Sequence, residues 1–290
     1  MPRIPVTKTP KVYVGGAFIR SESARTFALR DRAGEFVANI PQCTRKDLRN
    51  AVEAAAKAGP GWAKRTGYNR GQILYRLAEM LEARAGELRD SILIAGAPAG
   101  KKRDAATEVA LSIDRLVHYA GWADKYEHLL GSVNPVSGPF FNFTVTEPMG
   151  VVGVIAGDAA PLLALLSLIA PAIVSGNTVV ALASEHNPYP AILLGELLAT
   201  SDLPGGVVNL LTGFRKEMIP TYASHAHIRA LSAICGPDDG RVLAMGAADS
   251  VKRVRLKDPL SGNVWSDDAQ GLEWIRALVE CKTTWHPVGA

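Results

Sequence analysis

The three cysteines, Cys43, Cys235 and Cys281, are the side chains of this sequence best suited to act as nucleophiles. They lie far apart, without a CxxC pair or a cysteine/histidine metal spacing, so neither a disulfide framework nor a zinc site is predicted. A reactive cysteine needs a base or a helix N-terminus that lowers the pKa of its thiol. Cys235 could precede a helix, but no sequence feature supplies a base, and a small buried side chain is the favoured interpretation.

His225 and His227 could ligate a metal, because they alternate in the segment SHAHI. No third ligand lies near them in the sequence, whereas protein metal sites use three or four ligands. A solvated helix end is the favoured interpretation, and no metal is predicted.

The turn that follows the segment GVVGVIA (150–156) is the third place where chemistry is expected. That segment is rich in valine and predicts a buried strand, and an apolar helix begins at Pro161. In α/β proteins, ligands bind in the turns that follow the carboxyl ends of strands. Yet the turn at 157–160 has the sequence GDAA, which offers almost no chemically active side chain.

The elements around this turn predict an α/β fold. From residue 150 onward, strands and helices alternate, which is typical of parallel βαβ units with helices covering a sheet. The segments expected before that point are short strands at 11–40, helices at about 44–59, 70–95 and 103–128, a turn-rich connector at 131–140, and a strand at 140–148. The expected architecture is a Rossmann-like parallel sheet with flanking helices.

Composition narrows the possible partners. Hydrophobic residues make up 48% of the 290 residues, and the net charge is +4. This mild basicity requires no acidic partner, and KRVRLK (252–257) alternates charge as a half-exposed strand does, so no nucleic acid is expected. The uncharged run 159–183 is interrupted by Pro171 and Gly176, which predicts a helix and a strand and no membrane span. The N-terminal segment lacks the apolar core of a signal peptide, so we expect a cytoplasmic location.

Five stretches, in the order and spacing of the family, resemble the aldehyde dehydrogenase superfamily. They are AGPGWA with the helix that follows it (58–88), EVALSIDRLVHYAGWADK (108–125), TVTEPMGVVGVIA (144–156), IAPAIVSGNTVV (169–180) and LPGGVVNLLTGF (203–214). The resemblance covers nearly all of the chain. It implies a Rossmann-like sheet that holds a cofactor without the usual glycine fingerprint. It also implies a small β arm, made of a mid-chain strand and the C-terminal strand, that joins subunits.

The resemblance implies that the catalytic residues are absent. In the family, a cysteine thiolate attacks the aldehyde, an asparagine amide stabilises the oxyanion, and a glutamate is the general base. Ala159 stands at the asparagine position and Lys257 at the glutamate position. A methyl group donates no hydrogen bond, and a lysine reverses the charge. The domain with the nucleophilic cysteine is missing after Lys257, and Cys281 stands at an ordinary position of the terminal strand.

The cofactor positions are also altered. The resemblance assigns them to Ser184, Glu185, Gly213 and Arg215, with Leu182 in place of a lysine. Glu185 keeps the acidic residue of the family, whereas Arg215 replaces a glycine that lets the cofactor approach. We therefore expect no cofactor, or NAD or NADP only if this degenerate site still binds. Arg215 as a substitute phosphate partner remains an alternative.

The resemblance also predicts the domains and the association surface. The candidate association residues are Phe141, Phe143, Val145, Lys282, Thr284 and Trp285. The expected parts are the N-terminal helices and strands of the cofactor-binding-type domain (1–130), the arm (131–147), the Rossmann-like part (148–257), a linker in place of the catalytic domain (258–270) and the oligomerisation tail (271–290).

The resulting prediction is a catalytically inactive subunit, a pseudoenzyme of the family. It would act as a structural or regulatory partner of a full-length NAD(P)-dependent aldehyde dehydrogenase, of a second copy of itself, or of both. A residual nucleotide-binding module is the first alternative, and a different catalyst that uses Cys235 is the second. A decaying paralogue without a role also fits the lost residues.

Overall fold

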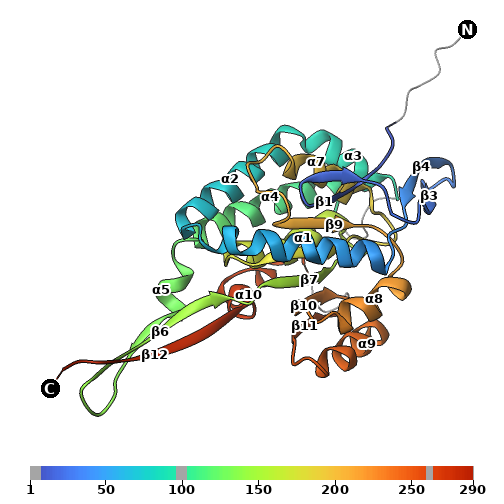
Figure 1. Cartoon of the computed structure of the whole chain (residues 1–290). Helices are drawn as coiled ribbons and strands as arrows, with labels where there is room; N and C mark the ends of the chain where they lie inside the picture. Colours follow the sequence, from blue (N-terminus) through green and yellow to red (C-terminus); the bar gives the residue numbers. More distant parts are fainter. Residues whose placement is uncertain (1–7, 96–102, 259–263, 290) are drawn as a thin grey trace, which may run out of the picture.

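A seven-stranded sheet forms the centre of the computed structural model, which describes residues 8–95, 103–258 and 264–289 (Figure 1). The strand order is β11-β10-β7-β8-β9-β1-β2. Strands β11 to β9 run parallel, as the alternation predicts, and β1 and β2 extend the sheet antiparallel beyond β9. The strands are β1 (Val12–Val14), β2 (Ala17–Ile19), β7 (Val151–Ile155), β8 (Thr178–Leu182), β9 (Val208–Leu211), β10 (Ile228–Ile234) and β11 (Arg253–Lys257). The predicted α/β fold class is confirmed.

Helices cover both faces of this sheet. They are α1 (Arg45–Ala63), α2 (Gly67–Ala83), α3 (Ala85–Leu93), α4 (Ala105–Trp122), α5 (Tyr126–Leu130), α6 (Pro161–Val174), α7 (Tyr189–Leu198), α8 (Arg215–Ser224), α9 (Pro237–Ala248) and α10 (Leu272–Arg276), with a 3₁₀ turn at Asp267–Ala269. Successive side chains of a strand point to opposite faces. Val152 and Val154 therefore enter a core with α2, α3, α4, α6 and α7, whereas Val151 and Ile155 enter a core with α1, α8 and α9.

Helix α6 explains the uncharged run 159–183. Every side chain of α6 is buried, and β8 follows it at Thr178 after a turn at Gly176. A helix that is apolar on all sides belongs inside a protein or a membrane. Within the described ranges, no helix combines the length and the hydropathy that a membrane crossing requires.

Two of the predicted helices are divided. The helix expected at about 70–95 breaks at Arg84, whose ψ of 24° ends α2 before α3 begins. The helix expected at about 103–128 breaks after Trp122, and α5 begins at Tyr126. Periodicity of apolar residues continues across both breaks, which is why the sequence did not reveal them.

A three-stranded sheet forms the arm, which extends away from the body of the protein (Figure 1). Its strands are β5 (Ser132–Asn134), β6 (Phe140–Pro148) and β12 (Val279–Pro287), in the order β12-β6-β5. β12 pairs antiparallel with β6 from Val279 opposite Pro148 to Pro287 opposite Phe140. The predicted arm of a mid-chain strand and the C-terminal strand is thereby confirmed. A separate hairpin is made of β3 (Thr26–Arg30) and β4 (Phe36–Pro41).

The close approach of α2 to the end of α4 depends on Gly67. A Cβ added at Gly67 would overlap the carbonyl oxygen of Ala123 and lie 3.1 Å from its carbonyl carbon. We expect Gly67→Ala to lower the free energy of unfolding by about 1–3 kcal/mol, since the clash is with backbone that must shift.

Gly61 provides the matched control, because it also lies in a helix but has no atom near its missing Cβ. Gly61→Ala should raise the free energy of unfolding by up to about 1 kcal/mol through helix propensity. Urea denaturation of both variants measures the difference. Equal effects of the same sign would contradict the packing at Gly67.

Candidate functional site

Three turns meet at the carboxyl ends of β7, β8 and β9, because parallel strands end at one edge of a sheet. Asp158 lies in the turn after β7, Ser184 and Glu185 lie in the turn after β8, and Arg215 begins α8 after β9. We call these four residues the strand-end cluster. All but Asp158 were candidate cofactor residues.

Arg215 makes the central contacts of the strand-end cluster. Its Nη1 donates to Asp158 Oδ2 over 2.6 Å, and its Nη2 donates to the carbonyl oxygen of Ala156 over 2.7 Å. The side chain of Arg215 is 17% exposed and that of Asp158 is 35% exposed. The Nε atom of Arg215 is buried without a hydrogen-bond partner among the described residues. Both Nη atoms of the guanidinium group therefore bind the turn after β7, whereas its Nε–H stays unpaired within the described chain.

Asp158 also joins the turn after β8. Its Oδ1 accepts hydrogen bonds from Ser184 Oγ at 2.6 Å, from the Glu185 N–H at 3.0 Å and from the His186 N–H at 3.3 Å. Burial acts to raise the pKa of Asp158, but the Arg215 charge and these hydrogen bonds outweigh it, so that the pKa lies below its ordinary value. The carboxylate form is thus the one that the fold stabilises.

Glu185 is engaged at the N-terminus of α8. Its Oε2 accepts the N–H of Arg215 over 2.8 Å. The first N–H groups of a helix have no partner within the helix and attract negative charge, so Glu185 fills that role for α8. The resemblance predicts a cofactor-binding acid at this position, whereas the Glu185 carboxylate binds protein backbone.

Gly213 is fixed by packing against the chain segment at Cys43. Its φ is +150°, and a Cβ at this position would lie 3.2 Å from the carbonyl oxygen of Cys43. The Cys43 N–H in turn donates to the carbonyl oxygen of Thr212 over 2.9 Å. The structure therefore brings all four candidate cofactor residues to one edge of the sheet and occupies each of them with protein contacts.

A cleft of about 630 Å³ borders the strand-end cluster on the side of the β3–β4 hairpin. Asp158, Glu185 and Arg215 of the cluster line it, together with Phe27, Arg30, His186, Phe214 and Lys216. A dinucleotide bound here would need Glu185 for its ribose, and the N-terminus of α8 or Arg215 for a phosphate. Glu185, the Arg215 side chain and the first N–H of α8 are already bonded within the chain. As arranged, the residues do not fit the cofactor of the family.

The two positions assigned to catalysis carry no suitable group. Ala159 lies exposed in the turn before α6, where its methyl group donates no hydrogen bond. Lys257 ends β11, with its Nζ 5.6 Å from the centre of the Trp274 ring. An amide donor and a carboxylate base are therefore absent from these two places.

The thiols of the two buried cysteines have raised pKa values. Cys235 is 5% exposed, and burial together with the Asp239 carboxylate raises the pKa of its thiol, against the Arg215 charge, which lowers it. Burial raises the pKa of Cys43 to about 12. Cys281 is exposed on β12 opposite Thr146. Because the thiolate is the nucleophile, these surroundings do not favour the reading of Cys235 as a catalyst.

His225 follows α8, and its ring centre lies 6.1 Å from that of His227. Burial, and then the charge of His227, lower the pKa of His225. In the part of the chain that the structure describes, no group of three or more His, Cys, Asp or Glu side chains could hold a metal ion.

The candidate association residues divide between the two faces of the arm. Residues directly opposite each other in an antiparallel pair share a face, and successive residues alternate. Phe143 pairs with Thr284, and Val145 pairs with Lys282. These four residues and Phe141 therefore lie on one face of the arm, which we call face B to distinguish it from the face that carries Trp285. Trp285 pairs with Asn142 on the other face, where its ring contacts Phe140 at 5.7 Å between centres.

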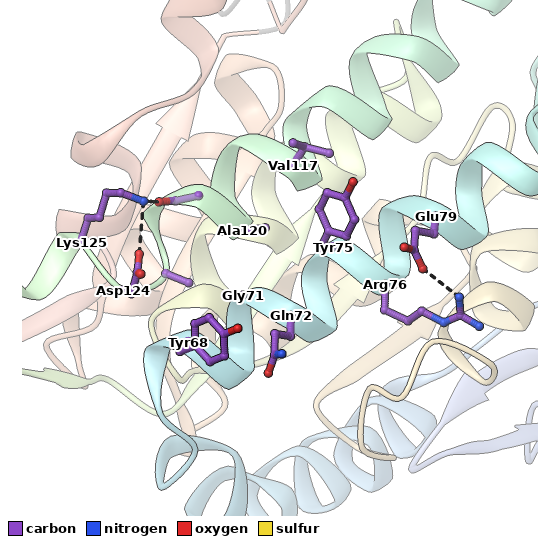
Figure 2. A pocket seen from close by; sticks show the side chains of 12 residues that line it. Tyr68, Gly71, Gln72, Tyr75, Arg76, Glu79, Val117, Ala120, Asp124 and Lys125 are labelled. Atoms are coloured by element: carbon purple, nitrogen blue, oxygen red, sulfur yellow. Dashed lines mark hydrogen bonds and ion pairs between the residues drawn. The ribbon is translucent and has the colours of Figure 1, made fainter.

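A second hollow, of about 600 Å³, lies between α2 and α4 (Figure 2). Figure 2 shows Tyr68 and Tyr75 on α2, with the small residues Gly71 and Ala120 between the two helices. The charged groups at its edge pair with one another, Arg76 with Glu79 and Lys125 with Asp124. Because these charged side chains pair with one another, they do not form a site that would bind a polar ligand in this hollow.

Sequence reasoning missed Asp158, which is the residue that connects the cluster. The turn GDAA was judged almost inert, although it contains an acid. The available signal was the new arginine at position 215, since a cation placed at the ends of buried strands needs an anionic partner. The buried acid Glu108 and the buried cation Arg115 on α4 were missed too, because both lie in a helix recognised by its apolar residues.

Comparisons with known proteins place the whole chain rather than its site. Residues 18–264 match the sequence model of the Aldehyde dehydrogenase family. Retinal dehydrogenase 2 of Gallus gallus is 35% identical over 260 residues, which are 86% of this chain and 48% of that protein. The mitochondrial aldehyde dehydrogenase of Rattus norvegicus is 32% identical over 281 residues, which are 91% of this chain and 52% of that protein.

Solved structures show the same relation. The NAD⁺ complex of aldehyde dehydrogenase from Bacillus cereus superimposes with a TM-score of 0.79 at 26% identity, over 86% of this chain and 50% of that one. HpcC from Thermus thermophilus superimposes with a TM-score of 0.80 at 31% identity, over 87% of this chain and 48% of that one. The chain thus spans about half the length of the curated relatives it matches.

Proposed function

This chain belongs to the aldehyde dehydrogenase family, and from that membership we propose that it is a catalytically inactive subunit whose function is association. Its partner would be a full-length aldehyde dehydrogenase, a second copy of itself, or both. Ala159 and Lys257 support the loss of catalysis, since neither can replace the amide or the carboxylate of the family's mechanism. The buried thiols of Cys43 and Cys235 support it further.

The arm is the observation that carries the proposal. β12 is the last strand of its sheet, so its outer edge presents backbone N–H and C=O groups that no described strand pairs. Such an edge is a template for another chain unless it is covered. Face B adds an apolar surface beside this edge, with Phe141 45% exposed and Val145 41% exposed. Exposed apolar groups that cluster on a projecting element support a role in protein association.

The alternative of a residual nucleotide-binding module receives less support. It requires Glu185 and Arg215 to be free, and both are bonded within the strand-end cluster. Its favourable feature is the cleft next to the cluster, which has room for a small molecule.

Association is tested by size-exclusion chromatography with light scattering and by native co-purification from the source, followed by mass spectrometry. We expect an assembly larger than one chain, or a stable complex with a full-length aldehyde dehydrogenase. The double variant Phe141→Ser/Val145→Ser should weaken this assembly by about tenfold or more, because apolar groups at an interface centre dominate its energy.

Met245→Ser is the matched control, since Met245 is an exposed apolar residue on α9, away from the arm. It should leave the assembly unchanged. A wild-type chain that stays monomeric, both alone and when mixed with the co-purified family members, would refute the proposal.

A further inference from the structure

We propose that Arg215 and Asp158 form a latch that replaces the cofactor: an internal ion pair that closes the strand ends against any dinucleotide. The inference concerns the strand-end cluster and not the arm, so it extends beyond the proposed function and is independent of it. It assigns to both residues a role that resemblance alone does not give.

The latch connects three turns that are far apart in the sequence. Arg215 belongs to the turn after β9, and it binds both Asp158 and the Ala156 carbonyl oxygen after β7. Asp158 binds Ser184 and two backbone N–H groups after β8. Hydrogen bonds between charged groups are about twice as strong as neutral ones, and the planar fork of arginine fixes their direction. The strand ends are thus held together without a bound molecule.

The charges of the latch oppose an anionic ligand. A helix N-terminus at the end of a parallel strand is ordinarily suited to bind a phosphate. At α8 this place is taken by the Glu185 carboxylate, which accepts the Arg215 N–H over 2.8 Å. With Asp158 also ionised, the strand-end cluster holds two carboxylates and one guanidinium group. A diphosphate brought to this edge would have to lie beside these two carboxylates, which repel it, although Arg30 and Lys216 also line the cleft.

Arg215 is poorly placed to serve as a substitute phosphate partner in this arrangement. Each of its Nη atoms already donates one hydrogen bond to the turn after β7, and its Nε is buried. A phosphate that bound another N–H of the guanidinium group would lie beside the Asp158 carboxylate, which repels it.

A double-mutant cycle with Asp158→Asn and Arg215→Gln tests the latch. Asp158→Asn keeps the side-chain size and Arg215→Gln shortens the side chain while removing its charge; the stability of each variant is measured by urea unfolding. We expect the two residues to be coupled. Each single variant raises the unfolding equilibrium constant, and the double variant should raise it by at least about tenfold less than the product of the two single increases.

The ion pair of Arg25 with Glu217 supplies the matched control cycle, because it also involves α8 but is 52% and 39% exposed. Arg25→Gln and Glu217→Gln should show coupling of less than about fivefold. Additive effects at Asp158 and Arg215, or coupling no larger than in the control, would overturn the latch.

Calorimetric titration of the wild-type chain with NAD and NADP gives a second measurement, which stays decisive even if a variant fails to fold. We expect no heat of binding and no rise in melting temperature at millimolar cofactor. Binding to the wild-type chain with Arg215 in place would refute the latch. Light scattering separates this result from the proposed function, since latch variants should keep the assembly of the wild-type chain.

Discussion

Replacing Arg115 by methionine is expected to lower the free energy of unfolding by about 3 kcal/mol, because two buried carbonyl groups would lose their donor. Arg115 on α4 is 2% exposed. Its Nη1 donates to the carbonyl oxygen of Ala269, and its Nη2 donates to that of Val264 over 3.1 Å. Methionine fills the volume of the stem but offers no hydrogen bond.

The loss should be local as well as global. Arg115 fixes the segment that precedes α10 and β12, and β12 forms the edge of the arm. Hydrogen exchange is therefore expected to accelerate in residues 264–278 before it changes in the central sheet. Arg241→Met, at an exposed position of α9, removes the same charge and should change the stability by less than about 0.5 kcal/mol. Equal losses for both variants would contradict the anchoring role of Arg115.

The second large effect depends on pH and concerns Glu108. This side chain is fully buried, and its Oε1 accepts the N–H groups of Leu162 at 2.8 Å and Leu163 at 3.2 Å. Its Oε2 has no partner in the described chain. Burial raises the pKa of Glu108 to about 7, although the two N–H groups act to lower it.

The sign of the effect follows from this shift. A folded state whose carboxyl pKa lies above the unfolded value, 4.5, binds the extra proton between these two values. The contribution of Glu108 to the free energy of unfolding is therefore fully present below about pH 4.5, and it is lost as the pH rises through about 7. Glu108→Gln keeps an acceptor for Leu162 and Leu163 and cannot ionise. At pH 8 it should be more stable than the wild-type chain by up to about 3 kcal/mol.

Urea unfolding at pH 5 and pH 8 measures this change as the difference between the two proteins, so that other titrating groups cancel. Glu82→Gln, at an exposed position of α2, is the control and should leave the pH dependence unchanged. If the free energy of unfolding depended on pH in the same way for the wild-type chain and for Glu108→Gln, ionisation of Glu108 would not destabilise the folded state, and the prediction would be wrong.

Sequence reasoning recovered the elements whose pattern is local. The valines of β7 and the apolar run of α6 predicted a buried strand and helix, because burial on all sides leaves no polar positions. The pairing of β6 with β12 was predicted only through the family resemblance. No local pattern in Phe140–Pro148 identifies a partner strand elsewhere in the chain.

The contacts that define the candidate site could not be read in the same way. Asp158 and Arg215 are separated by more than fifty residues, and each has an unremarkable sequence neighbourhood. Their meeting depends on the order of β7, β8 and β9 in the sheet, which alternation alone does not give. Likewise, KRVRLK predicted a half-exposed strand, but not that Arg255 would lie 3.5 Å above the Trp274 ring of a later helix.

The two long strands of the arm have a consequence for the synthesis of the chain. Thr144 and Thr283 face each other across the arm, although 139 residues separate them. On the ribosome, β6 emerges just after β5, with which it pairs, but long before β12, so the edge that β12 covers stays open through the translation of α6 to α10. A nascent chain with an open strand edge is prone to aggregation and to pairing with other chains. The arm is therefore completed only when β12 has been made, and chaperone demand at the arm should be greatest before that point.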